Sequence, residues 1–537
     1  PQGVPEPSLA QYTPKAKDAH TRVIKNKCDI EAWKVLVGEA QGASMKHIKG
    51  EILQRVLQAF PTSGKHWKMY AEHLAAQGKK KEAAEAIEKV LPVCPQIDLW
   101  KMFITLTGQL STDPAALSKV YERAVDAVGQ DINSNSLWGE YIAFLRNLKV
   151  NNQYENSQRL NQLRRAYQRC LQVPMHSVDR FWGEYEAWEK SIDPNNVPQA
   201  EAAVRAFEPK HKLARACYKD RNKMRNQILT PSFPGPYTGD VKDKASLKAW
   251  KELIAFERSN PQKMLSEDLR KRVAFTYNLC LSHLPLYPEV WHQAAQWHGE
   301  IGDLKGEVKM LERGIQMLPD CLMLHLALAE KHELRGNNAE AKKVYDQLAE
   351  SLPGPLVFIH YMRFARRAEG VAAARSVFKR ARKSPQACTW HVFADSALRE
   401  YRINKDPVVA RNVFDMGLKF YGAQTKYVKI YLDFLMQLND DNNTRVLFEK
   451  VLADDAGLDR QQALQIWNKL VEFEYSRGDL STIQKVEQRR AILYPELRDV
   501  TGLGQLACRY RFLDQWPCGK LDLELLDLEN EGMSPVA

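Results

Sequence analysis

Apolar and aromatic residues along this chain recur three or four positions apart, the spacing of one face of a helix. Trp33, Trp67, Trp100 and Trp138 lie 34, 33 and 38 residues apart. Each opens a short pattern of further apolar or aromatic residues at helical spacing, such as Trp67-x-x-Tyr70. Strands would show alternation of polar and apolar residues instead. The pattern therefore predicts helices that repeat with a period near that of the tryptophans.

A second helical run follows each of these patterns and ends at a helix breaker. EKVLPVCP ends at Pro95, YQRCLQVP at Pro174 and LERGIQMLP at Pro319, and neither Pro nor Gly continues a helix easily. Each unit is thus a helix, a turn and a second helix. Because such a unit cannot bury its apolar face alone, neighbouring units must stack. The sequence predicts an all-α superhelical solenoid of about eleven tetratricopeptide-like helix pairs.

Most of the residues expected to form the core of the repeats are aromatic residues of the first helices. They are Trp33, Trp67, Tyr70, Trp100, Trp138, Tyr141, Trp182, Tyr185, Trp250, Trp291 and Trp467. Cys170 and Cys280 fall where other units carry Ala, Val or Gly. We therefore expect these two cysteines to be small buried hydrophobic residues rather than reactive thiols.

The regular spacing breaks in the middle of the chain. Residues 198–228 read as one long helix, and residues 229–244 are rich in Pro and Gly, as loops are. We place a domain boundary at about residue 240. The predicted organisation is a flexible N-terminal segment (1–28), an N-terminal domain of about five repeats (29–240), a C-terminal domain of about six repeats (241–500) and a C-terminal extension (501–537).

Two clusters of basic residues are candidate binding surfaces. The first lies in the long helix and comprises Lys210, Lys212, Arg215, Lys219, Arg221, Lys223 and Arg225. It could bind RNA or an acidic partner, although a solvated helix face explains most such charge runs. The second comprises Arg366, Arg367, Lys379, Arg380, Arg382 and Lys383. It could contact an acidic protein surface, or form ordinary ion pairs within its repeat, for example with Glu369.

Composition narrows the class of protein. The 537 residues are 44% hydrophobic and 27% charged, which suits a folded protein, and the net charge is +11. The nine cysteines form no CxxC pair, so we expect a reducing compartment, cytosol or nucleus. No apolar run has membrane-spanning length, and the Pro-rich start is not a secretory signal. Because the chain starts at Pro1 rather than Met, we expect it to be a piece of a longer protein.

Motifs that carry catalysis are not found. The sequence contains no GxxxxGK[ST], GxSxG or HExxH motif. His325 and His332 lack partners at metal-ligand spacing, so packing or surface positions are expected. Asp440 and Asp441 are expected to cap a helix that begins near Thr444. We predict no catalytic residue, no metal site and no cofactor, and hence no enzyme.

Several motifs resemble a known repeat. Trp67-x-x-Tyr70-Ala71-Glu72 and the second-helix run Tyr-Glu-Arg-Ala at 121–124 resemble the HAT (half-a-tetratricopeptide) repeat. The runs YMRFARRAEG (361–370), LNDDNNTRVLFEKVL (438–452), GDLSTIQKVEQRR (478–490) and RYRFLDQWPC (509–518) resemble the suppressor-of-forked family. That family is the HAT-repeat scaffold subunit of cleavage stimulation factor and is related to yeast Rna-fourteen. The resemblance covers residues 29–518.

The resemblance implies a function. Such a protein is a nuclear, non-catalytic homodimer that dimerises through its second HAT domain and acts in cleavage and polyadenylation of pre-mRNA. It bridges the RNA-binding and WD-repeat subunits of cleavage stimulation factor to the cleavage and polyadenylation specificity factor, with RNA contacted indirectly. In the family a Pro-rich tail binds the RNA-binding subunit. No such tail occurs before Ala537, so binding of that partner is not implied for this chain.

Two other functions stay open. A HAT scaffold of a splicing or ribosomal-RNA-processing complex would have the same composition and periodicity. A direct RNA-binding protein would use the basic helix, and its binding would be sensitive to salt.

Overall fold

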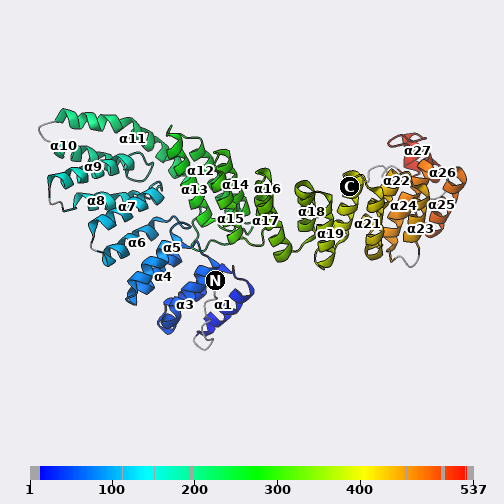
Figure 1. Ribbon diagram of the computed structural model, residues 1–537, viewed down its shortest axis with the longest axis horizontal. Coiled ribbons are helices and arrows are strands. Elements are labelled where there is room, and N and C mark those ends of the chain that lie inside the picture. The colour runs from blue at the N-terminus through cyan, green and yellow to red at the C-terminus, as the bar shows by residue number, and fades with distance from the viewer. Residues whose placement is uncertain are drawn as a thin grey trace. The chain divides into compact units, whose positions relative to one another are not determined.

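A computed structural model describes residues 12–111, 113–149, 152–192, 197–453, 457–497, 502–526 and 528. In this part of the chain there are 27 α-helices and a 3₁₀-helix, and the only β-type pairing is an isolated bridge between Phe512 and Gln515. The predicted fold class, all-α with stacked helix pairs, is confirmed (Figure 1). None of the described helices is both long and apolar enough to cross a membrane.

Contacts divide the chain into two compact units, residues 1–328 and 329–537. The first unit holds α1 (Pro14–Lys25), α2 (Ile30–Gln41), η2 (Ala43–Ile48), α3 (Lys49–Ala59), α4 (Gly64–Ala76), α5 (Lys80–Val90), α6 (Ile97–Leu110), α7 (Pro114–Val128), α8 (Asn135–Arg146), α9 (Gln153–Cys170), α10 (Val178–Ile192), α11 (Val197–Arg225), α12 (Val241–Arg258), α13 (Ser266–His283), α14 (Pro288–Glu300) and α15 (Leu304–Met317). The division falls within α16 (Leu322–Leu334).

The second unit continues the same architecture. It holds α17 (Asn338–Ser351), α18 (Pro355–Glu369), α19 (Val371–Lys383), α20 (Trp390–Arg402), α21 (Pro407–Tyr421), α22 (Thr425–Gln437), α23 (Asp441–Val451), α24 (Arg460–Arg477), α25 (Leu480–Leu493), α26 (Gly502–Arg509) and α27 (Lys520–Leu525).

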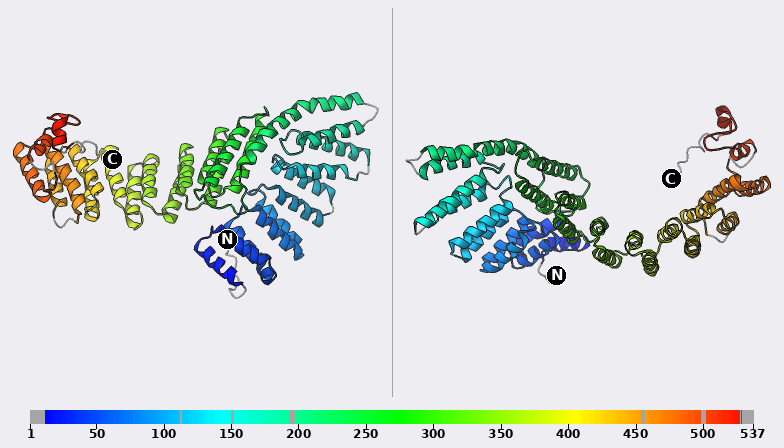
Figure 2. Two further views of the ribbon diagram at one scale, coloured as in Figure 1. Left: turned by 180° about the vertical axis from the view of Figure 1, so that it is seen from behind. Right: turned by 45° about the horizontal axis from the view of Figure 1, so that its top comes forward.

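The helices pair in chain order: each even-numbered helix from α2 to α14 and from α18 to α24 packs on the helix that follows it. In the first unit these pairs lie side by side as successive antiparallel layers (Figure 2). The described residues form eleven such pairs, five before residue 240 and six after it. The pair α10–α11 contains the long basic helix, which lacked the regular second-helix motif in the sequence.

Successive pairs are joined by a recurring aromatic and acidic contact. The ring of Tyr345 on α17 stacks on Tyr361 of α18, with ring centroids 5.3 Å apart. The Tyr361 hydroxyl donates to Asp346, the residue after Tyr345, at 2.9 Å. Arg380 on the next second helix also pairs with Asp346. The aromatic and charged residues that recur in the second helices therefore bind the following repeat.

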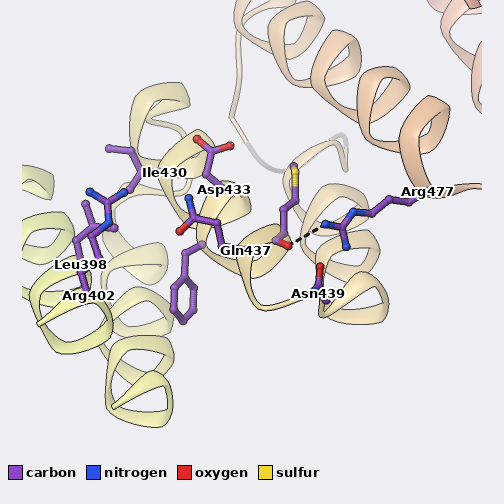
Figure 3. A pocket seen from close by; sticks show the side chains of 9 residues that line it. Leu398, Arg402, Ile430, Asp433, Gln437, Asn439 and Arg477 are labelled. Carbon is purple, nitrogen blue, oxygen red and sulfur yellow. Dashed lines mark hydrogen bonds between the residues drawn. The ribbon is translucent and has the colours of Figure 1, made fainter. Parts of the chain in front are cut away.

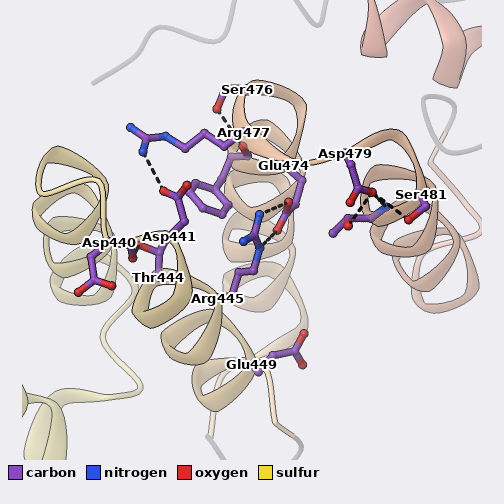
Figure 4. Close-up of polar contacts among 12 residues, drawn as sticks. Asp440, Asp441, Thr444, Arg445, Glu449, Glu474, Ser476, Arg477, Asp479 and Ser481 are labelled. Carbon is purple, nitrogen blue, oxygen red and sulfur yellow. Dashed lines mark hydrogen bonds and ion pairs between the residues drawn. The ribbon is translucent and has the colours of Figure 1, made fainter.

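A second recurring contact is a buried glutamate near the end of a first helix. The arginine that pairs with it comes from the preceding second helix. The four pairs are Arg164–Glu189 (2.7 Å), Arg221–Glu257 (2.8 Å), Arg375–Glu400 (2.7 Å) and Arg445–Glu474 (2.8 Å). Figure 4 shows Arg445 reaching Glu474 with two bonds. Each glutamate follows a core aromatic by seven residues, as in Trp250 and Glu257. Seven positions return to the same helix face.

Most of the aromatic residues expected in the core are buried. Trp33, Trp100, Trp138, Tyr141, Tyr185, Trp250, Trp291 and Trp467 are at most 5% exposed. Trp67, Tyr70 and Trp182 are half-buried. At α10 the innermost position belongs to Phe181, which is fully buried, and Trp182 stacks on His211 of α11 instead.

The segment between α11 and α12 has a packing role beyond that of a linker. Phe233 is buried against Phe60 and His66 of the first repeats, and the Ser63 hydroxyl donates to the Ser232 carbonyl at 2.5 Å. A β-carbon at Gly235 would lie 2.7 Å from the terminal carbon of the Ile30 side chain, so a larger residue at this position would require Ile30 to move. The loop is shorter than the predicted 229–244, because α12 already begins at Val241.

Helices on either side of residue 240 pack together. Gln262, between α12 and α13, donates to the Gln172 carbonyl just after α9 at 3.2 Å. Arg272 of α13 donates to the Gln130 side chain just after α7 at 3.0 Å. The boundary at about residue 240 between two HAT domains stays a prediction.

The chain ends differ from the expected segments. Residues 14–25, placed in a flexible segment by the sequence, form α1, with Ala16 and Ala19 buried. Thr13 caps this helix and Pro14 occupies its first turn. The start of the expected flexible segment, residues 1–11, and the end of the extension, residues 529–537, lie outside the described part of the chain.

Candidate functional site

The basic cluster of the long helix, here called the α11 cluster (Lys210, Lys212, Arg215, Lys219, Arg221, Lys223 and Arg225), is not one continuous surface. Arg221 is 4% exposed; it pairs with Glu257 and also donates to the Pro174 carbonyl at 3.3 Å. The guanidinium of Arg225 lies over the Trp250 ring, 5.7 Å from its centroid. Burial lowers the pKa of Arg225. These two arginines hold α11 against its neighbours.

The other members of the α11 cluster are exposed. Lys212 pairs with Glu208 at 2.7 Å and Arg215 with Asp179 at 3.2 Å. Lys219 and Lys223 make no ion pair with any described residue. The structure therefore leaves a smaller exposed basic face, to which the charges of Lys219 and Lys223 are fully available.

Most arginines of the second basic cluster form contacts between repeats. This cluster, here called the α18–α19 cluster, comprises Arg366, Arg367, Lys379, Arg380, Arg382 and Lys383. Arg367 pairs with Glu333 at 2.6 Å, and Arg380 with Asp346. Arg366 donates to Asn404 at 2.8 Å, and Arg382 lies over Phe378. Lys379 and Lys383 are exposed. Ion pairing does occur, but it links neighbouring helix pairs; Glu369 pairs with Lys342 instead.

A cavity in the second unit is lined by three consecutive first helices, α20, α22 and α24, and by the turn after α22. Its volume is about 420 Å³. Figure 3 shows Leu398 and Arg402 on one side, Gln437 between, and Arg477 on the other side. Arg477 donates to the Met436 carbonyl at 3.1 Å and pairs with Asp441 at 2.8 Å. The wall mixes apolar and polar groups, as sites for peptide side chains do.

The two adjacent carboxylates Asp440 and Asp441 are directed to different partners. Asp440 caps α23 by accepting from the Asn443 amide, and it also pairs with Arg411. Hydrogen bonds from the Asn443 side chain and from Arg411 hold the pKa of Asp440 below its usual value. Asp441 pairs with Arg477 (Figure 4). The capping prediction is confirmed, although the helix begins at Asp441 rather than near Thr444.

The cysteines and histidines that could carry reactive or metal chemistry are instead packed within the repeats. Cys170 and Cys280 are fully buried, as predicted, and burial raises the pKa of both thiols. The His325 imidazole lies 3.0 Å from the Cys321 carbonyl, and His332 is half-buried. Within the described ranges, no group of three or more His, Cys, Asp or Glu side chains could hold a metal ion.

Sequence comparison matches this chain to a known protein family over most of its length. The model of the family described as Suppressor of forked protein (Suf) matches residues 14–523. Cleavage stimulation factor subunit 77 of Arabidopsis thaliana is 35% identical over 92% of this chain and 69% of its own length. Protein suppressor of forked of Drosophila melanogaster is 31% identical over 94% and 73%. The mRNA 3′-end-processing protein rna14 of Schizosaccharomyces pombe is 26% identical over 88% and 70%.

A solved structure has a similar fold. The crystal structure of CstF-77 superposes with a TM-score of 0.55 at 20% identity, and the match covers 84% of this chain and 96% of the other. The resemblance inferred from the runs after Tyr361 agrees with these matches.

Proposed function

The chain belongs to the Suppressor of forked protein family, and from this we propose that it is a non-catalytic scaffold in the cleavage and polyadenylation of pre-mRNA 3′ ends, acting in the nucleus. The observation that carries the proposal is the match to relatives named for 3′-end processing over most of the chain. A splicing or ribosomal-RNA scaffold is the alternative, and it has no comparable support.

The arrangement of the side chains supports a scaffold. Charged residues of neighbouring repeats bind each other in a fixed pattern, as in Arg375–Glu400 and Arg445–Glu474. Such pairs hold successive helix pairs in register, so a stack presents a long surface with little rearrangement. Partners would then bind preformed features such as the cavity between α20, α22 and α24.

We further propose that the chain forms a homodimer through its C-terminal HAT repeats. Aliphatic side chains are exposed on α25, with Leu480 54% and Ile492 78% exposed. Contiguous exposed apolar groups, such as the neighbouring Ile492 and Leu493 (48% exposed), mark protein interfaces more often than single ones do. Light scattering of the whole chain at micromolar concentration should give the mass of two chains, and Ile492→Glu should shift it toward one. A monomer for the unsubstituted chain would contradict the dimer.

The proposed partners are the WD-repeat subunit of cleavage stimulation factor and subunits of the cleavage and polyadenylation specificity factor, which the chain would bridge. The RNA-binding subunit is proposed as a partner of the full-length protein. The test is pre-mRNA cleavage in a nuclear extract depleted of this protein. Cleavage at the polyadenylation site should be lost and should return on adding back the full-length protein. Intact cleavage with loss of splicing would contradict the proposal and favour the alternative.

A further inference from the structure

A basic cavity of about 610 Å³ lies in the first unit, between the second helices α7 and α9, the helix α11 and the turn before α13. Five cations and two carboxylates line it. They are Arg169, Lys210, Lys263, Lys271 and Arg272, and Asp126 and Asp268. Arg169 pairs with Glu122 and Asp126, and Lys271 pairs with Glu267. Lys210, Lys263 and Arg272 form no ion pair with a described residue, and these three charges favour an anionic occupant.

The floor of the cavity is a buried guanidinium. Arg272 is 2% exposed and donates only to amide oxygens: the side chains of Gln130 and Gln262, and the Gln172 carbonyl. No carboxylate among the described residues forms an ion pair with it. The nearby Glu257 pairs with Arg221 instead. Burial lowers the pKa of Arg272 to about 10. A buried charge with no carboxylate in direct contact is costly, and an incoming anion would relieve that cost.

The walls of this cavity are preformed. The turn between α12 and α13 is closed by Asn260, whose side chain bonds both the amide and the carbonyl of Met264. Gln262 ties the same turn to α9. Leu265, which follows Met264 in this turn, is 78% exposed, and Leu213 of α11 is 39% exposed. A rigid cation with aliphatic groups on the rim fits an acidic side chain that has an aliphatic neighbour.

The cavity fits nucleic acid less well. Its aromatic residue, Trp138, is 1% exposed and already lies beneath Arg169, so no ring face is open for a base. The rim also carries the exposed carboxylate of Asp268.

We propose that this cavity binds a segment of a partner protein in which Asp or Glu residues flank an aliphatic residue, with a carboxylate directed at Arg272. The proposal does not rest on the role in pre-mRNA processing, because binding can be measured with this chain alone.

The test selects ligands from a displayed library of random peptides with the whole chain as bait. Enriched peptides should combine acidic and aliphatic residues. The most enriched peptide, labelled for fluorescence anisotropy, should bind about tenfold more weakly to the variant Lys210→Glu/Lys271→Glu and to Leu265→Asp. The variant Lys80→Glu/Lys81→Glu, with the same change in net charge on exposed residues of α5, should bind as the unsubstituted chain does.

Substitution of Arg272 at the floor of the cavity distinguishes binding in the cavity from attraction to surface charge in general. Arg272→Gln should weaken binding, and Arg272→Lys, which keeps the charge, should restore part of it; circular dichroism checks that each variant is folded. If Arg272→Gln does not fold, the rim variants decide alone. Peptides without acidic enrichment, or equal binding by rim and control variants, would overturn the proposal. So would a single-stranded RNA that binds in the peptide's place and is lost with the same variants.

Discussion

The two basic clusters have similar numbers of charges in the sequence but different uses in the structure. In the α11 cluster, the arginines at the end of the helix are buried or packed on neighbouring helices, while Lys219 and Lys223 are exposed and pair with no carboxylate in the part of the chain that the structure describes. In the α18–α19 cluster, Arg367 and Arg380 bind acids of the preceding repeat. The number of charges in a run therefore does not predict a binding surface. Whether a basic side chain stays free to bind a partner depends on the positions of Asp and Glu residues in the neighbouring repeat.

Among these contacts, loss of the buried Arg221–Glu257 pair should lower the free energy of unfolding most. Glu257→Ala leaves Arg221 buried without its carboxylate and should lower the free energy of unfolding by about 4 kcal/mol. Glu333→Ala, its match in the α18–α19 cluster, frees an Arg367 that is 55% exposed, so the loss should stay below about 1 kcal/mol. Urea unfolding followed by circular dichroism measures both. Equal losses would break the distinction between the clusters.

Acid should weaken the first unit through two buried histidines. Desolvation, helped by Lys65, lowers the pKa of His66 to about 4, and desolvation with Arg225 lowers the pKa of His283 to about 4. Both pKa values lie below that of the unfolded chain, about 6.5. The contribution to stability is therefore complete above pH 6.5 and is lost as the pH falls toward about 4.

Each histidine should add a slope of about 1.4 kcal/mol per pH unit in that window. His283→Gln should reduce the slope measured by urea unfolding between those pH values, whatever its effect at neutral pH. An unchanged slope would contradict a neutral, buried His283.

The aromatic and acidic contact between repeats should contribute less. Asp346 accepts from Tyr361 and pairs with Arg380, and both charged side chains are about 40% exposed. Asp346→Asn should cost about 1 kcal/mol, since it weakens a partly screened pair and keeps a hydrogen-bond acceptor. Tyr361→Phe should cost a similar or smaller amount. A loss as large as that of Glu257→Ala would mean that the exposed contacts, too, hold the stack together.

The exposed residues of α11 should have the smallest effect on stability. Lys212→Glu, Arg215→Glu and Lys219→Glu together should change the free energy of unfolding by less than about 1 kcal/mol. The same triple variant tests direct RNA binding. If the unsubstituted chain binds RNA tightly and the variant does not, the basic face is an RNA site; a scaffold that contacts RNA indirectly predicts weak binding by both.

The periodic part of the fold could be predicted from the sequence because similar residues make the same contacts in each repeat. Trp138, Trp250 and Trp291 mark first helices, and Cys170 and Cys280 mark small packing positions, all as expected. The buried glutamates were missed, although Glu257 and Glu474 stand seven residues after Trp250 and Trp467. A glutamate at a core position can be recognised as buried only when its partner, such as Arg221, is known to lie on the preceding helix.

Other features could not be predicted because they depend on distant contacts. The buried face of α1 consists of Ala16, Ala19, His20 and Val23, with no large apolar residue, so it gives a weak signal in the sequence. Phe233 and Gly235 sit in a Pro- and Gly-rich segment that reads as a linker, yet they pack on the first repeats. The cavity above Arg272 combines side chains from five segments, and its first and last lining residues, Val125 and Arg272, are more than a hundred residues apart.

The most direct test of the scaffold assignment is quantitative purification of the tagged full-length protein from nuclei, with its partners identified by mass spectrometry. A scaffold of 3′-end processing should bring down cleavage stimulation factor subunits and subunits of the cleavage and polyadenylation specificity factor in stoichiometric amounts, retained after ribonuclease treatment. Recovery of splicing or ribosomal-RNA-processing proteins instead, or loss of all partners with ribonuclease, would contradict it.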